Sequence, residues 1–245
     1  MCIRDSVLAP DDSDPPDSDL YNPAAMKYRY AAGVYFMFPS LFRHDSQTLD
    51  IRLAVSRDGI HWTWPDQATP FIPLGKEGEF DSGSLYMGQG MLRRRNELYL
   101  YYGGSRLNHA EGELENLTKP AGSRIFSRVT VPLDRFVSAE AGDKKGRFTT
   151  PPLIFDGNTL VLNADVHDGG DIRVAILDID GQPFEHRSTA DCLPLSGHQH
   201  VKQVFWNTDG DVSAWAGRPV RLQIELSSAN LYSFQFRQGY PYRVK

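Results

Sequence analysis

Hydrophobic and polar residues alternate with a period of two along most of the chain, and helical periodicity is almost absent. The clearest alternating segments are residues 49–55, 220–226 and 232–236. Each of them predicts a strand with one buried face. A continuous apolar run at residues 34–38 predicts a strand that is buried on both faces. The pattern therefore predicts an all-β protein.

A weak internal repeat in the first half of the chain predicts two blades of a β-propeller. The first copy starts at Asp19 and predicts strands at 24–28, 34–38, 49–56 and 61–64. The second starts at Asp81 and predicts strands at 86–92, 97–102, 124–131 and 136–139. Four antiparallel strands form one blade, and closed propellers have about four to eight blades. Two blades would leave open edges, so we expect the chain to be the C-terminal part of a longer protein.

The second half of the chain has short predicted strands without this repeat. Hairpin signals stand at 156–158 and 178–181. About seven strands follow residue 148, near 149–155, 159–165, 171–178, 183–188, 201–206, 219–226 and 230–237. This pattern predicts a β-sandwich. The small, charged segment 140–146 marks the boundary, so we expect a partial propeller over 7–141 and a sandwich over 147–245. Residues 1–6 differ from the rest and match a translated sequencing adapter, so we expect them to be an artefact.

Composition excludes several classes of protein. With 26 basic and 31 acidic residues, the formal net charge is 26 − 31 = −5, which argues against a nucleic-acid partner. No apolar run approaches the ~20 residues of a membrane-spanning helix, so no membrane partner is expected. Two cysteines are too few for a disulfide framework.

Four strings in the first half resemble a known group of enzymes. The strings are 19–23 (DLYNP), 54–62 (AVSRDGIHW), 80–83 (FDSG) and 98–104 (LYLYYGG). They resemble the five-bladed β-propellers of glycoside hydrolase families 32, 43 and 68, some of which carry a β-sandwich after the propeller. The resemblance implies hydrolysis of a glycosidic bond by carboxylate acid/base catalysis, without an organic cofactor. The turn around Asp58 is interpreted as structural, with Trp62 packing between blades.

Two aspartates are the candidate catalytic residues. The resemblance implies that carboxylates at the starts of blades face the central funnel, and Asp19 and Asp81 stand at those positions. The alternative is that each aspartate caps a turn by accepting backbone hydrogen bonds. Neither blade start carries the glutamate of the resembled families, so the general acid stays unidentified.

Seven further residues are candidates for binding the substrate. They are Tyr21, Asn22, Arg43, His44, Tyr86, Arg106 and His109. The two histidines each follow the second strand of a blade, and the two arginines near them could bind hydroxyl or anionic groups of a sugar. The two tyrosines stand beside the blade starts, where aromatic rings either stack on sugars or pack between strands. The alternative for the histidines is an exposed loop position.

No metal or cofactor is predicted. His198 and His200 lack a third ligand at a fitting spacing. Asp165, Asp168 and Asp171 lack the order of a defined calcium loop. Cys192 is interpreted as a small buried hydrophobe.

The sequence leaves three functions open. The first is the C-terminal part of a glycoside hydrolase that acts on an oligo- or polysaccharide, with the fragment itself inactive. The second is a non-catalytic carbohydrate-binding or structural module, and the third is a propeller related to glycoside phosphorylases. The expected partners are a carbohydrate and the remainder of the same propeller. If the protein degrades sugars, we expect it outside the cell or in the periplasm.

Overall fold

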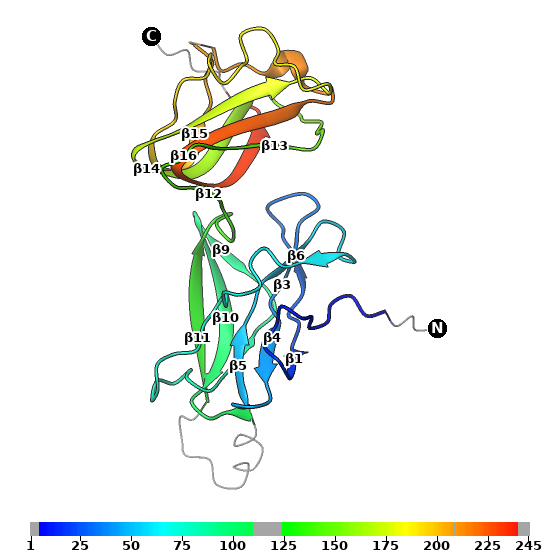
Figure 1. Cartoon of the computed structure of the whole chain (residues 1–245), viewed down its shortest axis with the longest axis vertical. Helices are drawn as coiled ribbons and strands as arrows, with labels where there is room; N and C mark the ends of the chain where they lie inside the picture. The colour runs from blue at the N-terminus through cyan, green and yellow to red at the C-terminus, as the bar shows by residue number, and fades with distance from the viewer. Residues whose placement is uncertain (1–4, 110–123, 208, 240–245) are drawn as a thin grey trace. The chain divides into compact units, whose positions relative to one another are not determined.

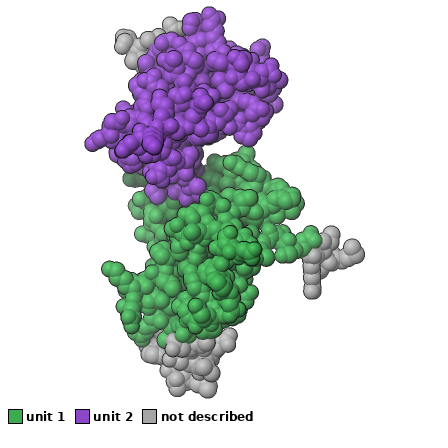
Figure 2. Space-filling model, viewed as in Figure 1, with its two compact units in different colours: residues 1–131 green, residues 132–245 purple. Residues whose placement is uncertain are grey.

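A computed structural model describes residues 5–109, 124–207 and 209–239 (Figure 1). Within these ranges the chain is built from strands joined by loops and one 3₁₀ turn, η2 (Ser213–Trp215), which confirms the all-β prediction. None of the described helices is long and apolar enough to cross a membrane. The chain divides into two compact units, residues 1–131 and 132–245 (Figure 2). The first four residues of the expected adapter lie outside the described ranges.

The first unit contains a seven-stranded sheet, called sheet A here. Its strands are β1 (Ser18–Tyr21), β4 (Ser40–Arg43), β5 (Thr48–Ile51), β8 (Ser84–Met87), β9 (Leu92–Arg94), β10 (Glu97–Ser105) and β11 (Arg124–Pro132). They follow the order β1-β4-β5-β8-β10-β11, and β9 pairs with β10. β5 and β8 are parallel neighbours, whereas the pairs β1–β4, β4–β5 and β8–β10 are antiparallel.

A smaller antiparallel sheet, sheet B, completes the first unit. Its strands are β2 (Met26–Lys27), β3 (Tyr35–Met37), β6 (Ala54–Ser56) and β7 (Trp62–Thr63), in the order β2-β3-β6-β7. They coincide with the four strands predicted for the first repeat. The apolar run 34–38 passes Pro39 and continues into sheet A as β4, and the predicted strand 49–56 divides into β5 and β6. These two connections link the sheets, and Arg52 N–H donates to Pro39 C=O at the crossing (2.8 Å).

The turn between β6 and β7 has the structural role expected from the sequence. Ser56 Oγ accepts the Gly59 amide, and Asp58 Oδ1 accepts the amides of Ile60 and His61. The His61 ring, 2.7 Å from Asp58 Oδ2, and these amides lower the pKa of Asp58 well below its usual range. The aspartate therefore shapes the turn.

Three strands of the second repeat lie in sheet A as β8, β10 and β11, but the fourth lies elsewhere. It begins later than expected, as β12 (Ala139–Ala141), and pairs with β16 of the second unit. The chain turns after β11 because Pro132 has no amide hydrogen to continue a ladder and Asp134 adopts a positive φ of 62°. The number of propeller blades therefore stays a prediction.

The second unit is organised around two long strands. Its strands are β12, β13 (Gly146–Thr149), β14 (Thr159–Leu177), β15 (Gly197–Gln203) and β16 (Arg221–Arg237). They form one sheet in the order β12-β16-β14-β15, with β13 also paired to β16. β14 and β16 each unite two predicted strands, because their shared ladder continues past a register shift between Val166 and Asp171. Leu160, Leu162, Ile176, Leu222 and Trp206 are buried in the core of this unit. The two-sheet sandwich stays a prediction.

Candidate functional site

Six side chains meet on one face of sheet A. They are Asp19, Tyr21, Phe42, His44, Tyr86 and His109, and they are called the face cluster here. The strand register explains how the first members meet: Asp19 lies opposite Phe42 on β4, and Tyr21 lies opposite Ser40. Opposite residues of an antiparallel pair share a face, and residues two apart along a strand do the same.

The contacts within the face cluster are close. His44 Nε2 lies 2.9 Å from Asp19 Oδ2, and the His44 ring lies 4.6 Å from the ring of Phe42. Tyr21 contacts Phe42 edge-on at 5.2 Å and His109 at 5.4 Å. Tyr86 Oη lies 2.9 Å from His109 Nδ1. Phe42 is buried beneath the other side chains of the face cluster, whereas the side chain of Asp19 is 57% exposed and accessible to a ligand.

Backbone contacts bring the two histidine loops together. The amide of His109 donates to Gln47 C=O at 2.7 Å, which fastens the loop after β10 to the turn after β4. Ser84 Oγ donates to Leu107 C=O in the same loop. A Cβ atom at Gly83, just before β8, would lie 2.4 Å from that carbonyl oxygen, so a glycine is needed where this loop approaches the start of the strand. The equivalent positions that the repeat predicts for His44 and His109 are therefore close in space.

Asn22 and Arg106 lie at the margins of the face cluster. Asn22 donates through Nδ2 to Met87 C=O (2.8 Å), which links the end of β1 to the end of β8. Arg106 is exposed in the loop after β10, and no contact with the face cluster is seen in the described part of the chain.

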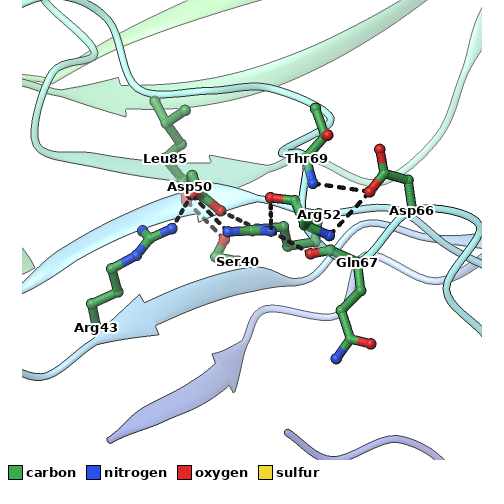
Figure 3. A network of polar contacts seen from close by, with 9 residues as sticks. Ser40, Arg43, Asp50, Arg52, Asp66, Gln67, Thr69 and Leu85 are labelled. Carbon is green, nitrogen blue, oxygen red and sulfur yellow. Dashed lines mark hydrogen bonds and ion pairs between the residues drawn. The ribbon is translucent and has the colours of Figure 1, made fainter. Parts of the chain in front are cut away.

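Arg43 lies on the opposite face of sheet A, in a buried polar network (Figure 3). Arg43 NH2 donates to Asp50 Oδ2 at 2.6 Å, and Arg52 Nε donates to Asp50 Oδ1 at 2.6 Å. Arg52 also donates to Gln67 C=O (2.6 Å), which holds the loop before residue 70 against β5. Arg43 is thus paired with Asp50 within the fold, and the phosphorylase alternative stays a prediction.

Asp81 also lies apart from the face cluster. Tyr102 Oη donates to Asp81 Oδ2 at 2.9 Å, and burial raises the pKa of Tyr102, an effect that this carboxylate increases. Tyr102 pairs with Met87, and the next pair is Gly103 with Tyr86, so Tyr102 and Tyr86 point to opposite faces. Asp81 is therefore on the face opposite Asp19, and the two predicted catalytic carboxylates do not face a common space. The catalytic role of each stays a prediction.

The face cluster combines groups suited to a hydroxyl-bearing ligand. The Asp19 carboxylate accepts hydrogen bonds, the imidazoles and the Tyr86 hydroxyl donate or accept them, and the aromatic rings offer apolar surface. Sequence reasoning missed Phe42. The signal was present, since Phe42 lies on β4 two residues before His44, at the spacing that puts two side chains on the same face of an extended chain.

A second polar region lies in the other unit. A concave region of about 550 Å³ is lined by His167, Asp168 and His198, among others. His198 Nδ1 lies 3.2 Å from Asp165 Oδ1, and Arg135 NH1 donates to Asp165 Oδ2 at 2.5 Å. Burial opposes ionisation of Asp165, but Arg135 and His198 outweigh it and lower its pKa.

Two of the aspartates weighed for a calcium loop are paired with arginines: Asp165 with Arg135 and Asp171 with Arg173. Asp171 pairs with Arg173 (2.9 Å) and accepts from Ser227, so the aspartates of the suggested calcium loop are bound to different partners. No group of three or more metal-ligating side chains is found among the described residues. Cys192 is buried, accepts the Val174 amide, and has a pKa raised to about 11 by burial, so it is not a nucleophile at neutral pH.

Comparison with known proteins gave only weak similarity to solved structures. No protein-family model and no curated protein sequence matches the chain. Among solved structures, the chain is similar to a glycoside hydrolase family 43 arabinoxylan arabinofuranohydrolase from Bacillus subtilis, in complex with cellotetraose. The identity is 11%, the TM-score is 0.26, and the match covers 89% of this chain and 54% of that one. The chain thus spans about half the length of that structure, and a similarity at this level does not establish a family.

Proposed function

We propose that this protein binds a carbohydrate on the face of sheet A that carries the face cluster. The observation that carries the proposal is the exposed Asp19–His44 pair beside the rings of Tyr21 and His109. A sugar presents hydroxyl groups at its edge and C–H groups on its faces. A carboxylate with an imidazole partner binds the former, and aromatic rings bind the latter.

The finer proposal is that this face forms the substrate-binding surface of a glycoside hydrolase, with Asp19 as one of its carboxylates. Glycoside hydrolysis uses two carboxyl groups, about 5 to 9.5 Å apart, that face the same bond. Asp81 accepts a hydrogen bond from Tyr102 on the other face of the sheet, so in this proposal we expect another residue to supply the second group. We therefore expect the 245-residue chain to bind a saccharide and to leave its glycosidic bonds intact.

Calorimetric titration with a panel of neutral, amino and acidic oligosaccharides tests the binding proposal. Tyr21→Ala and Asp19→Asn are expected to weaken binding about tenfold or more, because each removes a group that meets the ligand. Tyr30→Ala is the matched control, since Tyr30 is 37% exposed in the same unit and Tyr21 is 36% exposed. Absence of binding by every member of the panel, or equal losses in Tyr21→Ala and Tyr30→Ala, would contradict the proposal.

Hydrolysis of aryl glycosides is the assay for the finer proposal. No turnover above that of the Asp19→Asn variant is expected from this chain. Turnover that disappears in both Asp19→Asn and Asp81→Asn would show that the two carboxylates act together and that the assignment of faces is wrong.

A further inference from the structure

Large apolar side chains are exposed on the strands beside the face cluster. Phe126 on β11 is 90% exposed, Leu92 on β9 is 61% exposed and Tyr101 on β10 is 45% exposed. Together with Tyr99 they are called the aromatic strip here. Leu92 pairs with Tyr99, and Tyr101 follows two residues later, so these side chains share one face of sheet A. Exposed apolar side chains gathered on one sheet face mark an interaction surface more often than isolated ones do.

The aromatic strip continues directly into the face cluster. Gly103 pairs with Tyr86, the face-cluster residue that contacts His109, and lies two residues after Tyr101 on the same face of β10. A Cβ atom placed on Gly103 would lie 3.8 Å from the ring of Phe126. Because Gly103 has no side chain, none rises from β10 between Tyr86 and Phe126. The two regions therefore form one continuous surface.

Polar groups border the aromatic strip. The Arg128 guanidinium lies 4.2 Å from the ring centroid of Tyr99, and the Tyr99 hydroxyl donates to Glu97 (3.1 Å). Rings exposed on one side with charged groups beside them suit a ligand that has both C–H faces and hydroxyl groups. A wholly apolar partner would leave these charged groups buried and incompletely paired.

We infer that the carbohydrate site extends across Gly103 onto the aromatic strip, so the ligand is a chain of several sugar residues. This inference rests on the proposed function. The surface runs from β1 to β11, five strand steps in the order of sheet A. At about 4.8 Å per step this is about 24 Å along the sheet. A monosaccharide or disaccharide covers a part of that length, and a longer oligosaccharide spans it.

Titration with a length series of one oligosaccharide that binds, from the monomer to the hexamer, tests this inference. Affinity is expected to rise with length until the strip is covered. Phe126→Ala is expected to weaken binding of the longest members about five- to tenfold and to leave the shortest unchanged, because an exposed stacking ring contributes at that level. Since Phe126 is 90% exposed, its removal leaves the core intact. Ile60→Ala, at a position 63% exposed on the β6–β7 turn, is the control.

The outcomes separate this inference from the proposed function. If Tyr21→Ala abolishes binding while affinity is independent of length and of Phe126, the inference is overturned and the proposed function stands. If no saccharide of any length binds, both fail. Sedimentation velocity gives a further outcome: concentration-dependent dimerisation that Phe126→Ala abolishes would mean that a second copy covers the strip, and the inference would be overturned.

Discussion

Asp50 is the position at which a single substitution is expected to weaken the first unit most clearly. Its side chain is 4% exposed and accepts hydrogen bonds from two arginines, Arg43 and Arg52 (Figure 3). The side chain of Arg52 is 6% exposed, so in Asp50→Ala a buried guanidinium loses its counterion. Removal of one partner from a buried ion pair costs about 3–5 kcal/mol. Arg43→Ala is expected to cost less, about 1–2 kcal/mol, because Arg43 is 23% exposed and the Asp50–Arg52 pair remains.

Amide hydrogen exchange is the suitable measurement, because a chain with two compact units need not unfold in one step. Opening free energies of the amides in β4 and β5 are expected to fall in Asp50→Ala, and those in β14 and β16 of the other unit serve as the internal reference. The double variant Asp50→Leu/Arg52→Met is expected to recover part of the loss, since it removes the buried Arg52 charge and leaves only Arg43, which is 23% exposed, without its carboxylate partner. A loss below about 1 kcal/mol in Asp50→Ala, or an equal loss in β14, would refute the reasoning.

Three further outcomes are expected. Gly83→Ala is expected to displace the loop that carries Leu107 and His109, because the added Cβ would meet a carbonyl oxygen at 2.4 Å. Saccharide binding and the NMR resonances of the His109 ring should then change. Gly142→Ala is the control and should change neither, because a Cβ at Gly142 meets no atom within 4 Å. Burial raises the pKa of Cys192 from 9.0 to about 11, so the thiol of the unfolded chain ionises first and the free energy of unfolding falls as pH rises from about 9 to 11. This loss of about 3 kcal/mol should be absent in Cys192→Ala. A constant difference in stability between the two proteins over that pH range would contradict it. The pKa of Asp165 is lowered in the folded state, so its contribution to the stability of the second unit is present above the unfolded value of 3.8 and is lost as pH falls below that value. Asp165→Asn should abolish this part of the destabilisation by acid. An unchanged dependence of unfolding on acid pH would contradict the pairing with Arg135.

Local patterns were sufficient for the parts of the fold that depend on neighbours in sequence. The period-two alternation predicted an all-β chain, and the strands of the first repeat coincide with β2, β3, β6 and β7. The turn around Asp58 was also predictable, because Ser56 and Asp58 cap amides that are at most three residues away. In the second unit, the sequence pattern predicted two separate strands within each of β14 and β16, and the long ladder between these two strands joins them.

The composition of the face cluster depended on pairings between distant strands. The repeat placed His44 and His109 at equivalent positions, but their loops are brought together by the hydrogen bond from the His109 amide to Gln47 C=O, between segments that are far apart in sequence. Alternation shows that Phe42 and Arg43 point to opposite faces, and it does not show which face meets Asp19. The register between β1 and β4 decides that Phe42 and His44 join Asp19 while Arg43 pairs with Asp50.

By itself, the sequence determined the class of structure and the positions of most strands, because side-chain alternation and turn residues act over a few residues. Tertiary structure alone decided that Asp19 and Asp81 lie on opposite faces of one sheet, and that Tyr86 is continuous with Phe126 across Gly103. The physical reason is that a strand presents two faces in strict alternation, and which face becomes a surface is settled by the strands that pair with it and pack against it.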